Sequence, residues 1–319
     1  MHFGVLINTT QYVLQPFPVE QASHIDDLYK LNCERNRQIL QQMDEICAVL
    51  ANHGIEPVFM KVTGCLLSNV YADIGERMIG DIDMLVEEKN YLKTAELIMQ
   101  LGYRNDEPVY DDFMTLKHYP RLYRTDVPAD IEIHRLVVHN KYGKKFNSEI
   151  VFGNKQTIAD RANCFAPSLT HLVIHNFIHN QLIDNCYRFK IRSLRDMFDI
   201  YRLSPTIDFQ EVMEQVEEKK KAGAYFHIIG LVFNTRFHCS QFGITNGQRY
   251  DAVLTFFRNH GRLHLFYIRL LKLYDWLFKR YLLMIMSLPF SKSNRQHVFK
   301  RLRDKKWYRV HFNDFRRSF

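Results

Sequence analysis

The sequence lacks the features that identify several common classes of protein. Its six cysteines are scattered and form no CxxC pair, which argues against a disulfide framework and against a zinc site built on thiolates. The polar start, Met1 to Gly4, does not open a basic stretch followed by an apolar run, so we expect no secretory signal. Together these absences predict a protein of the reducing cytoplasm.

Long apolar runs are also missing. The longest extends from Tyr281 to Phe290 and falls far short of the ~20 residues that a membrane-spanning helix needs. The residues before it, 263–280, mix Leu, Phe, Tyr and Trp with basic side chains, which predicts an amphipathic helix instead. Repeats and low-complexity segments are absent as well. With 319 residues, the chain should form one large domain or two ordinary ones.

Charge is abundant but unevenly distributed. The formal charge of +8 combines 16 basic and 3 acidic residues at positions 258–319, a net of +13, with a net of −5 in the first 257 residues. Aromatic side chains are interspersed among the basic ones in this C-terminal segment. Such a segment suits docking to its own domain or to a partner protein first, an anionic membrane surface second and nucleic acid third.

Hydrophobic periodicity predicts different secondary structure in the two halves of the chain. In the first half we expect helices at residues 21–53, 65–71 and 92–101, and strands at residues 57–61, 81–86, 117–123 and 131–137. In the second half only helical spacing is present, over residues 169–183, 194–203, 209–225 and 249–257. This pattern predicts an α+β fold, in which a small mixed sheet with packed helices (1–155) precedes an all-helical domain (156–257) and the basic segment (258–319).

Three carboxylates form the strongest chemical pattern of the sequence. Asp81 and Asp83 lie two residues apart on a predicted strand, so their side chains point to the same face. Glu132 and His134 share one face of another short strand in the same way. If the two strands are neighbours, the three carboxylates converge, and oxygen ligands of this kind suit Mg²⁺. Taken alone, two aspartates at this spacing more often mark a solvent-exposed strand end than a metal site.

The order of several motifs resembles that of a known family. The motifs lie between Val58 and Leu203 and comprise Lys61-x-x-Gly64, Tyr71, Arg77, Gly80-Asp-Ile-Asp-Met-Leu-Val86, Leu101-Gly-Tyr103, His118-x-Pro120, Glu132-Ile-His134-Arg-Leu, Leu172-x-x-His175 and Ile191-Arg-Ser-Leu-Arg-Asp196-x-x-Asp199. In this combination they resemble the uncharacterised nucleotidyltransferase family of bacteria. That family belongs to the DNA polymerase beta-like nucleotidyltransferase superfamily.

The resemblance implies a reaction and a catalytic site. Asp81, Asp83 and Glu132 would be the catalytic residues and would bind the metal ions, Mg²⁺ or Mn²⁺. Glu132 would also orient or deprotonate the acceptor hydroxyl. The implied reaction transfers a nucleoside monophosphate from a nucleoside triphosphate to a hydroxyl, with release of pyrophosphate. The resemblance places the active cleft between the sheet domain and the helical domain.

The resemblance also implies how the nucleotide, ATP or another triphosphate, is bound. The residues expected around it are Lys61, Gly64, Cys65, Arg77 and Gly80. Gly64 would let backbone N–H groups approach the phosphates closely, because it has no Cβ. Lys61 and Arg77 would offset the charge of the triphosphate, which grows on the pyrophosphate side during transfer.

The acceptor and two other functions stay open at this stage. A sugar or other small metabolite, a peptide natural product, a protein side chain or an RNA end would each offer a hydroxyl. One alternative function is a toxin-like or defence transferase that modifies RNA or protein. The other is a catalytically idle scaffold that binds a partner, because Gly64 is followed by Cys65 where the superfamily usually has glycine or serine.

Two groups on the predicted helices have simpler explanations. The histidines at positions 171, 175 and 179 line one helix face, and we expect them to pack at the junction between the two halves rather than to bind a metal. Asp196 and Asp199 lie one helical turn apart, beside Arg192 and Arg195. We expect ordinary ion pairs along that helix, each worth a few tenths of a kcal/mol.

Overall fold

The computed structural model of the protein describes residues 19–105, 118–235, 237 and 244–278, together with the single residues 286, 289 and 295. The chain divides into two compact units, of which the first extends to Tyr187 and resumes from Arg192 to Tyr250. The second unit combines Arg188–Ile191 with the chain from Asp251 onward. The first unit therefore contains both the sheet and most of the helices that follow it. The domain boundaries expected at residues 155 and 257 stay a prediction.

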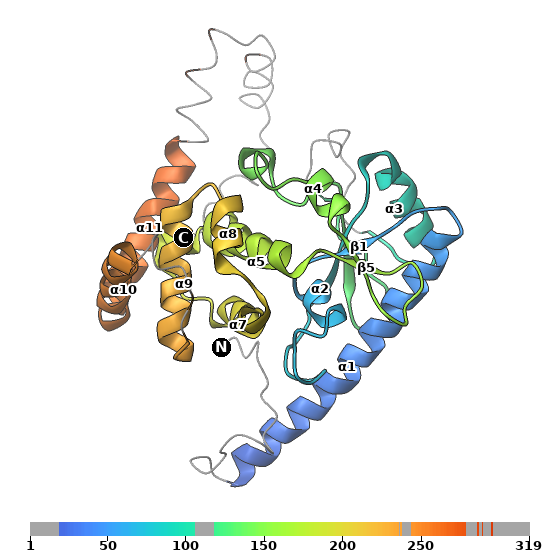
Figure 1. The fold of residues 1–319 in the computed structure, drawn as a ribbon, viewed down its shortest axis with the longest axis horizontal. Helices are drawn as coiled ribbons and strands as arrows, with labels where there is room; N and C mark the ends of the chain where they lie inside the picture. The colour runs from blue at the N-terminus through green and yellow to red at the C-terminus, as the bar shows by residue number, and fades with distance from the viewer. Residues whose placement is uncertain are drawn as a thin grey trace, which may run out of the picture. The chain divides into compact units, whose positions relative to one another are not determined.

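A five-stranded sheet lies within the first unit (Figure 1). Its order is β3-β2-β1-β5-β4, in which β2 pairs with β3 and β1 with β5 in parallel, and the other neighbours are antiparallel. The strands are short: β1 Val58–Phe59, β2 Asp81–Leu85, β3 Asp130–His134, β4 Gln156–Thr157 and β5 Phe165–Ala166. The expected small mixed sheet is confirmed, and two strands that the sequence does not reveal extend it beyond residue 155.

Three helices pack around this sheet. α1 (Val19–Ala51) buries a stripe formed by Ile39, Met43, Ile46 and Leu50. It ends before Gly54, whose φ of +64° lies in the left-handed region that favours glycine, so the expected long helix and its end are confirmed. α2 (Lys61–Leu67) contacts β2 and β5, while α3 (Tyr91–Gln100) contacts β3 and α1.

The remainder of the first unit is mainly helical, as the periodicity predicts. Its helices are α4 (Ser148–Gly153), α5 (Leu169–Phe177), α7 (Leu194–Leu203), α8 (Phe209–Gln215) and α9 (Lys219–Phe233). A π-helix, η4 (Ile178–Ile183), continues α5 without a break. α6 (Cys186–Phe189) and α10 (Ile244–Asn259) follow in the chain, and short 3₁₀ turns lie at Glu88–Asn90, Asn140–Tyr142 and Ser204–Thr206. Contacts of α5 with α7 and α8, and of α9 with both, build the helical core.

The second unit contains α11 (Gly261–Leu277), the expected amphipathic helix. An exposed apolar stripe runs along it, formed by Leu263, Phe266, Leu270, Tyr274 and Leu277. Elsewhere on α11, the hydroxyl of Tyr267 donates to the carbonyl of Arg188 at 2.9 Å. Most of residues 279–319, on which the predictions for the basic segment depend, lie outside the described residues. Within the described part of the chain, no helix is both long and apolar enough to span a membrane.

Three secondary-structure predictions are wrong in detail. The helix predicted over residues 65–71 lies four residues earlier, as α2 (Lys61–Leu67). The helix predicted over residues 209–225 is divided into α8 and α9, because Val216 has an extended backbone (φ −89°, ψ 143°) while its side chain fills the core. Residues 118–123 of the predicted strand at 117–123 run beside β3 without forming a regular strand. Tyr119 and Leu122 donate backbone N–H groups to that strand. Pro120, which has no N–H, interrupts the ladder between them.

Candidate active site

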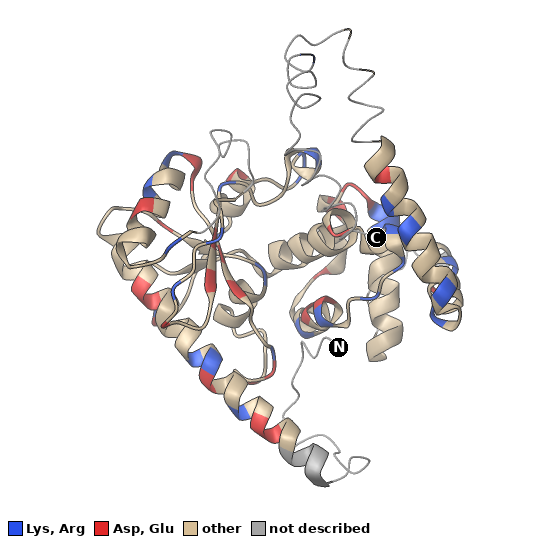
Figure 2. Ribbon diagram, turned by 180° about the vertical axis from the view of Figure 1, so that it is seen from behind, with Lys and Arg blue, Asp and Glu red and all other residues tan. Residues whose placement is uncertain are grey.

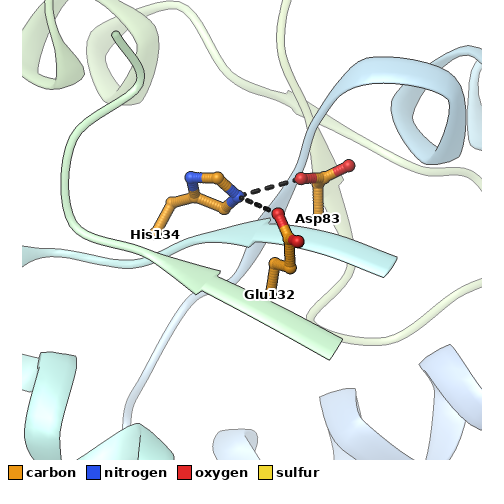
Figure 3. Close-up of side chains that lie close together, drawn as sticks. All are labelled: Asp83, Glu132 and His134. Atoms are coloured by element: carbon orange, nitrogen blue, oxygen red, sulfur yellow. Dashed lines mark hydrogen bonds and ion pairs between the residues drawn. The ribbon is translucent and has the colours of Figure 1, made fainter. Parts of the chain in front are cut away.

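The parallel pairing of β2 with β3 brings the predicted carboxylates together. Asp83 lies directly opposite Glu132 in the register, and Asp81 lies opposite Asp130. His134 Nε2 is 2.9 Å from Asp83 Oδ1 and 3.6 Å from Glu132 Oε2 (Figure 3). Among the described residues, Asp83, Glu132 and His134 form the only group of three potential metal ligands whose ligand atoms lie within 4.8 Å of one another. The carboxylates of Asp83 and Glu132 therefore lie close together, as expected if the two strands are neighbours, and His134 lies beside them.

Lys61 points into this group from the start of α2. Its ammonium is in contact with Asp83 Oδ1 and lies 3.9 Å from Glu132 Oε2. The backbone of Lys61 has φ +52°, a left-handed conformation that costs a non-glycine residue about 1–2 kcal/mol. Such a strained position persists only where its surroundings impose it, and it is common at functional sites. The geometry thus places Lys61 beside the carboxylates that the sequence singled out.

Arg121 is a site residue that the sequence analysis missed. Its Nη2 donates to Asp81 Oδ2 at 3.1 Å and to Glu132 Oε1 at 2.7 Å, so one guanidinium bridges two of the three carboxylates. The residue follows the His118-x-Pro120 motif on the irregular segment beside β3. The periodicity predicts a strand there but does not distinguish Arg121 within it, and only the contact with β3 reveals the position. Figure 2 shows acidic positions on neighbouring strands of the sheet, with basic positions close to them.

The electrostatic environment keeps two of these carboxyl groups ionised. Burial alone would raise the pKa of Asp83, but the charge of Lys61 and the hydrogen bond with His134 outweigh it and lower that pKa. The hydrogen bond with His134, together with that from Arg121, holds the pKa of Glu132 well below its usual range. Asp81 differs, because burial and the nearby charge of Asp83 raise its pKa. Ionised carboxylates at neutral pH are what a divalent cation requires of its ligands.

The donor set fits a hard divalent cation. Asp83 Oδ2 is buried and has no hydrogen-bond partner among the described residues, although a buried carboxylate oxygen normally has one. Together with Asp81 and Glu132 it offers oxygen ligands of the kind that Mg²⁺ and Mn²⁺ prefer. The residues present therefore suit the metal that the family resemblance implies.

A cavity of about 400 Å³ opens beside the carboxylates. One wall contains Lys61, Gly80, Asp81, Asp83, Arg121 and Glu132. The opposite wall comes from α5, η4 and α7, and it includes His175, Asn176, His179, Asn180, Arg195 and Asp196. The π-helix η4 contributes to this second wall directly, and π-helical turns are frequent at functional sites. The cavity therefore lies between the sheet and the helices of the first unit.

Arg77, which the resemblance assigns to the triphosphate, is engaged in a buried ion pair. Its Nε and Nη2 donate to the two oxygens of Asp199 at 2.9 and 3.2 Å, and the hydroxyl of Tyr71 donates to the same carboxylate at 2.8 Å. Burial alone would lower the pKa of Arg77, but the charge of Asp199 outweighs that effect and raises it. Asp199 is therefore not in an ordinary ion pair along its own helix, whereas Asp196 does contact Arg195 at 3.4 Å.

The other residues that the resemblance places around the nucleotide, Gly64, Cys65 and Gly80, lie in different environments. Gly64 is buried within α2 and its N–H donates to the carbonyl of Met60. A Cβ there would lie 2.6 Å from the carbonyl oxygen of Phe59, so packing rather than phosphate access explains this glycine. Cys65 lines the cavity, but burial raises the pKa of its thiol well above the usual range. Gly80 also lines the cavity, with open space where its side chain would be.

The histidines of α5 and η4 lie in different environments. His171 and His175 are buried, and burial lowers the pKa of His171. His179 Nδ1 lies 3.1 Å from Asp184 Oδ2. The burial of His171 and His175 agrees with the expected packing, while the expectation that these histidines bind no metal stays a prediction.

Comparisons with known proteins agree with the resemblance noted in the sequence. Residues 8–235 match the family described as "Uncharacterised nucleotidyltransferase". One similar solved structure is the antibiotic-resistance factor ANT(2'')-Ia in solution, with 13% identity, 64% of this chain and 97% of that chain covered, and a TM-score of 0.40. Another is crystalline ANT(2'')-Ia in complex with adenylyl-2''-tobramycin, with 11% identity, coverage of 58% and 95%, and a TM-score of 0.40. No curated protein matches. Because the family match spans most of its length, the chain belongs to the uncharacterised nucleotidyltransferase family.

Proposed function

We propose that this nucleotidyltransferase is metal-dependent and transfers a nucleoside monophosphate from a nucleoside triphosphate to a hydroxyl acceptor, with release of pyrophosphate. The observation that carries the proposal is the register of β2 and β3, which sets Asp83 opposite Glu132 beside a cavity. Asp81 lies at the start of the same strand, on the same cavity wall. Carboxylates that face each other repel, so this arrangement needs positive charge beside it, which Lys61 and Arg121 supply in this structure and a metal ion would supply during the reaction.

Each residue of this wall has a proposed role. Asp81, Asp83 and Glu132 would hold Mg²⁺ or Mn²⁺, which when bound offsets the charge of the phosphates and of the departing pyrophosphate. Glu132, which its lowered pKa keeps ionised, would orient the acceptor hydroxyl by accepting a hydrogen bond from it. His134 holds Asp83 and Glu132 in position through Nε2. Lys61 would supply a further positive charge next to the phosphates.

The opposite wall supports a small polar acceptor. Asn176, His179, Asn180 and Asp196 provide hydrogen-bonding groups at the cavity. We therefore favour a hydroxyl-bearing small molecule, such as a sugar, as the acceptor.

A nucleotide titration tests the metal site. ATP, GTP, CTP and UTP are each titrated into the purified chain with and without Mg²⁺, using the wild type, Asp81→Asn and Asp81→Asn/Asp83→Asn. Metal-dependent binding should weaken at least tenfold in both variants. Asp126→Asn is the matched control, because this aspartate is 70% exposed and does not line the cavity. Binding that is unchanged in the double variant would contradict the metal-site assignment, and thermal melting confirms that each variant is folded.

The acceptor is identified by transfer of label. Triphosphate labelled at the α-phosphate is incubated with cell extract, which is then separated into small-molecule, protein and RNA fractions. Label in the small-molecule fraction, dependent on Asp81 and Asp83, supports the proposal. Label in protein or RNA supports a toxin-like or defence transferase instead. Nucleotide binding without transfer to any fraction supports the idle scaffold.

A further inference from the structure

Arg121 occupies the position between two carboxylates where the proposed function requires a cation. Its guanidinium bridges Asp81 and Glu132 through one nitrogen, Nη2, at 3.1 and 2.7 Å. Nη1 lies 3.8 Å from Asp130, which is opposite Asp81 in the sheet. Among the described residues, the partners of this guanidinium are all carboxylates, and two of them are proposed metal ligands.

A divalent ion and this guanidinium compete for the same oxygens. Nη2 donates to both Asp81 Oδ2 and Glu132 Oε1, so these two oxygens lie within reach of one small positive group. A divalent ion bound by those two carboxylates would bring its two positive charges next to the positive charge of the Arg121 guanidinium, which hydrogen-bonds to the same oxygens. Like charges that close repel strongly, so the guanidinium and the ion cannot both keep these contacts.

Arg121 is the positive group of the site that is best able to leave. Lys61, in comparison, contacts the buried carboxylate of Asp83, and its side chain is only 24% exposed. The side chain of Arg121 is 50% exposed and extends from the irregular segment that follows Pro120. It can therefore turn away from the carboxylates without disturbing a strand or a helix.

We propose that Arg121 exchanges between two anionic partners: the carboxylates Asp81 and Glu132 in the cation-free site, and the triphosphate of the incoming nucleotide once a divalent ion has taken those carboxylates. This inference rests on the proposed function. Arg121 lines the same cavity, so phosphate groups bound beside the ion lie within its range. A guanidinium is suited to both partners, because its planar array of N–H donors matches carboxylate and phosphate oxygens alike.

The exchange predicts opposite effects from a single substitution. Arg121→Gln removes the competitor for the carboxylates, so Mn²⁺ alone should bind more tightly, by roughly threefold to tenfold for the loss of a half-exposed ion pair. The same variant loses a charge-assisted contact with phosphate, so ATP and pyrophosphate in the presence of saturating Mn²⁺ should bind about tenfold more weakly. Arg121→Lys keeps the charge without the planar array of donors and should lie between the wild type and Arg121→Gln in both measurements.

Calorimetry with the full chain tests both effects. Mn²⁺ is titrated alone, and ATP and pyrophosphate are then titrated at saturating Mn²⁺, into the wild type, Arg121→Gln, Arg121→Lys and Arg37→Gln. Arg37 is the control, because it is a 57% exposed arginine that pairs with Glu34 on α1 and does not line the cavity. Tighter metal and weaker phosphate binding in Arg121→Gln alone supports the exchange.

Three other results overturn the proposal in distinguishable ways. Weaker binding of both Mn²⁺ and ATP would show that Arg121 only maintains the structure of the site. Mn²⁺ binding that is unchanged in Arg121→Gln but lost in Asp81→Asn/Asp83→Asn would reject the exchange and leave the proposed function intact. Absence of Mn²⁺ binding in the wild type and in Arg121→Gln would reject the metal site itself, and the exchange with it.

Discussion

The buried ion pair between Arg77, before β2, and Asp199, on α7, should contribute strongly to stability, and replacing Asp199 tests this. Asp199→Ala leaves Arg77, which is 4% exposed, as a buried charge without its carboxylate partner. It deletes the acceptor of two guanidinium hydrogen bonds, at 2.9 and 3.2 Å, and of one from Tyr71 at 2.8 Å. Breaking such a pair from one side costs about 3–5 kcal/mol. We expect the free energy of unfolding of the first unit to fall by that amount and its thermal midpoint to fall by roughly 10 °C.

A double substitution shows whether the loss of stability in Asp199→Ala comes from the buried charge of Arg77 that has lost its partner carboxylate. Arg77→Met/Asp199→Leu removes both charged groups, and apolar side chains of similar volume replace a buried ion pair at little cost. The double variant should therefore be more stable than Asp199→Ala by about 2 kcal/mol or more. Urea unfolding followed by circular dichroism measures the free energy of unfolding of both variants. The comparison holds if the slope of that free energy with urea concentration is the same in both. A loss below about 1 kcal/mol in Asp199→Ala, or a double variant less stable than that single variant, would refute this reasoning.

The same double variant separates two roles of Arg77. The family resemblance assigns Arg77 to the triphosphate, whereas the structure directs its Nε and Nη2 to Asp199. Nucleotide affinity that is retained in folded Arg77→Met/Asp199→Leu would show that Arg77 positions the cavity wall. A loss of more than about tenfold, without loss of stability, would assign it to the phosphates after all.

Three further predictions concern other parts of the chain. Gly64→Ala should lower the free energy of unfolding by about 2 kcal/mol in urea, since its Cβ would lie 2.6 Å from a backbone oxygen; an unchanged value would contradict the packing explanation. Cys65 should resist iodoacetamide at pH 8 until the protein unfolds, because burial raises the pKa of its thiol, and peptide mass spectrometry of native and unfolded protein would reveal any early labelling. The membrane hypothesis for residues 258–319 requires that the chain sediment with anionic vesicles less strongly as salt rises, and not at all after truncation behind Gly261; sedimentation that survives truncation would reject it.

The sequence predicts the site where local spacing is enough to define it. Asp81 and Asp83 share a face because strand residues alternate, and Glu132 and His134 do so for the same reason. Their convergence also needs the parallel pairing of β2 with β3, which alternation cannot supply but the order of family motifs implies. The sequence could therefore identify the carboxylates before the sheet was known.

The contacts that the sequence does not predict join distant or irregular segments. Arg77 and Asp199 are 122 positions apart and meet only when α7 packs near the segment before β2. Arg121 extends from a segment in which a proline interrupts regular pairing with β3. The break at Val216 is hidden because this residue keeps the apolar spacing of a helix while adopting an extended backbone. In each case tertiary packing decides what local periodicity leaves undetermined.

The positive side chains around the facing carboxylates have a consequence for how the protein comes to be folded. Asp83 and Glu132 can be set side by side in the sheet before any ion arrives, because Lys61 and Arg121 already neutralise them. Assembly of the sheet is thereby independent of the supply of divalent ions during synthesis. A chain with such internal counter-ions can fold without a bound cation, and under the proposed function only its activity, not its architecture, would follow the levels of magnesium and nucleotide.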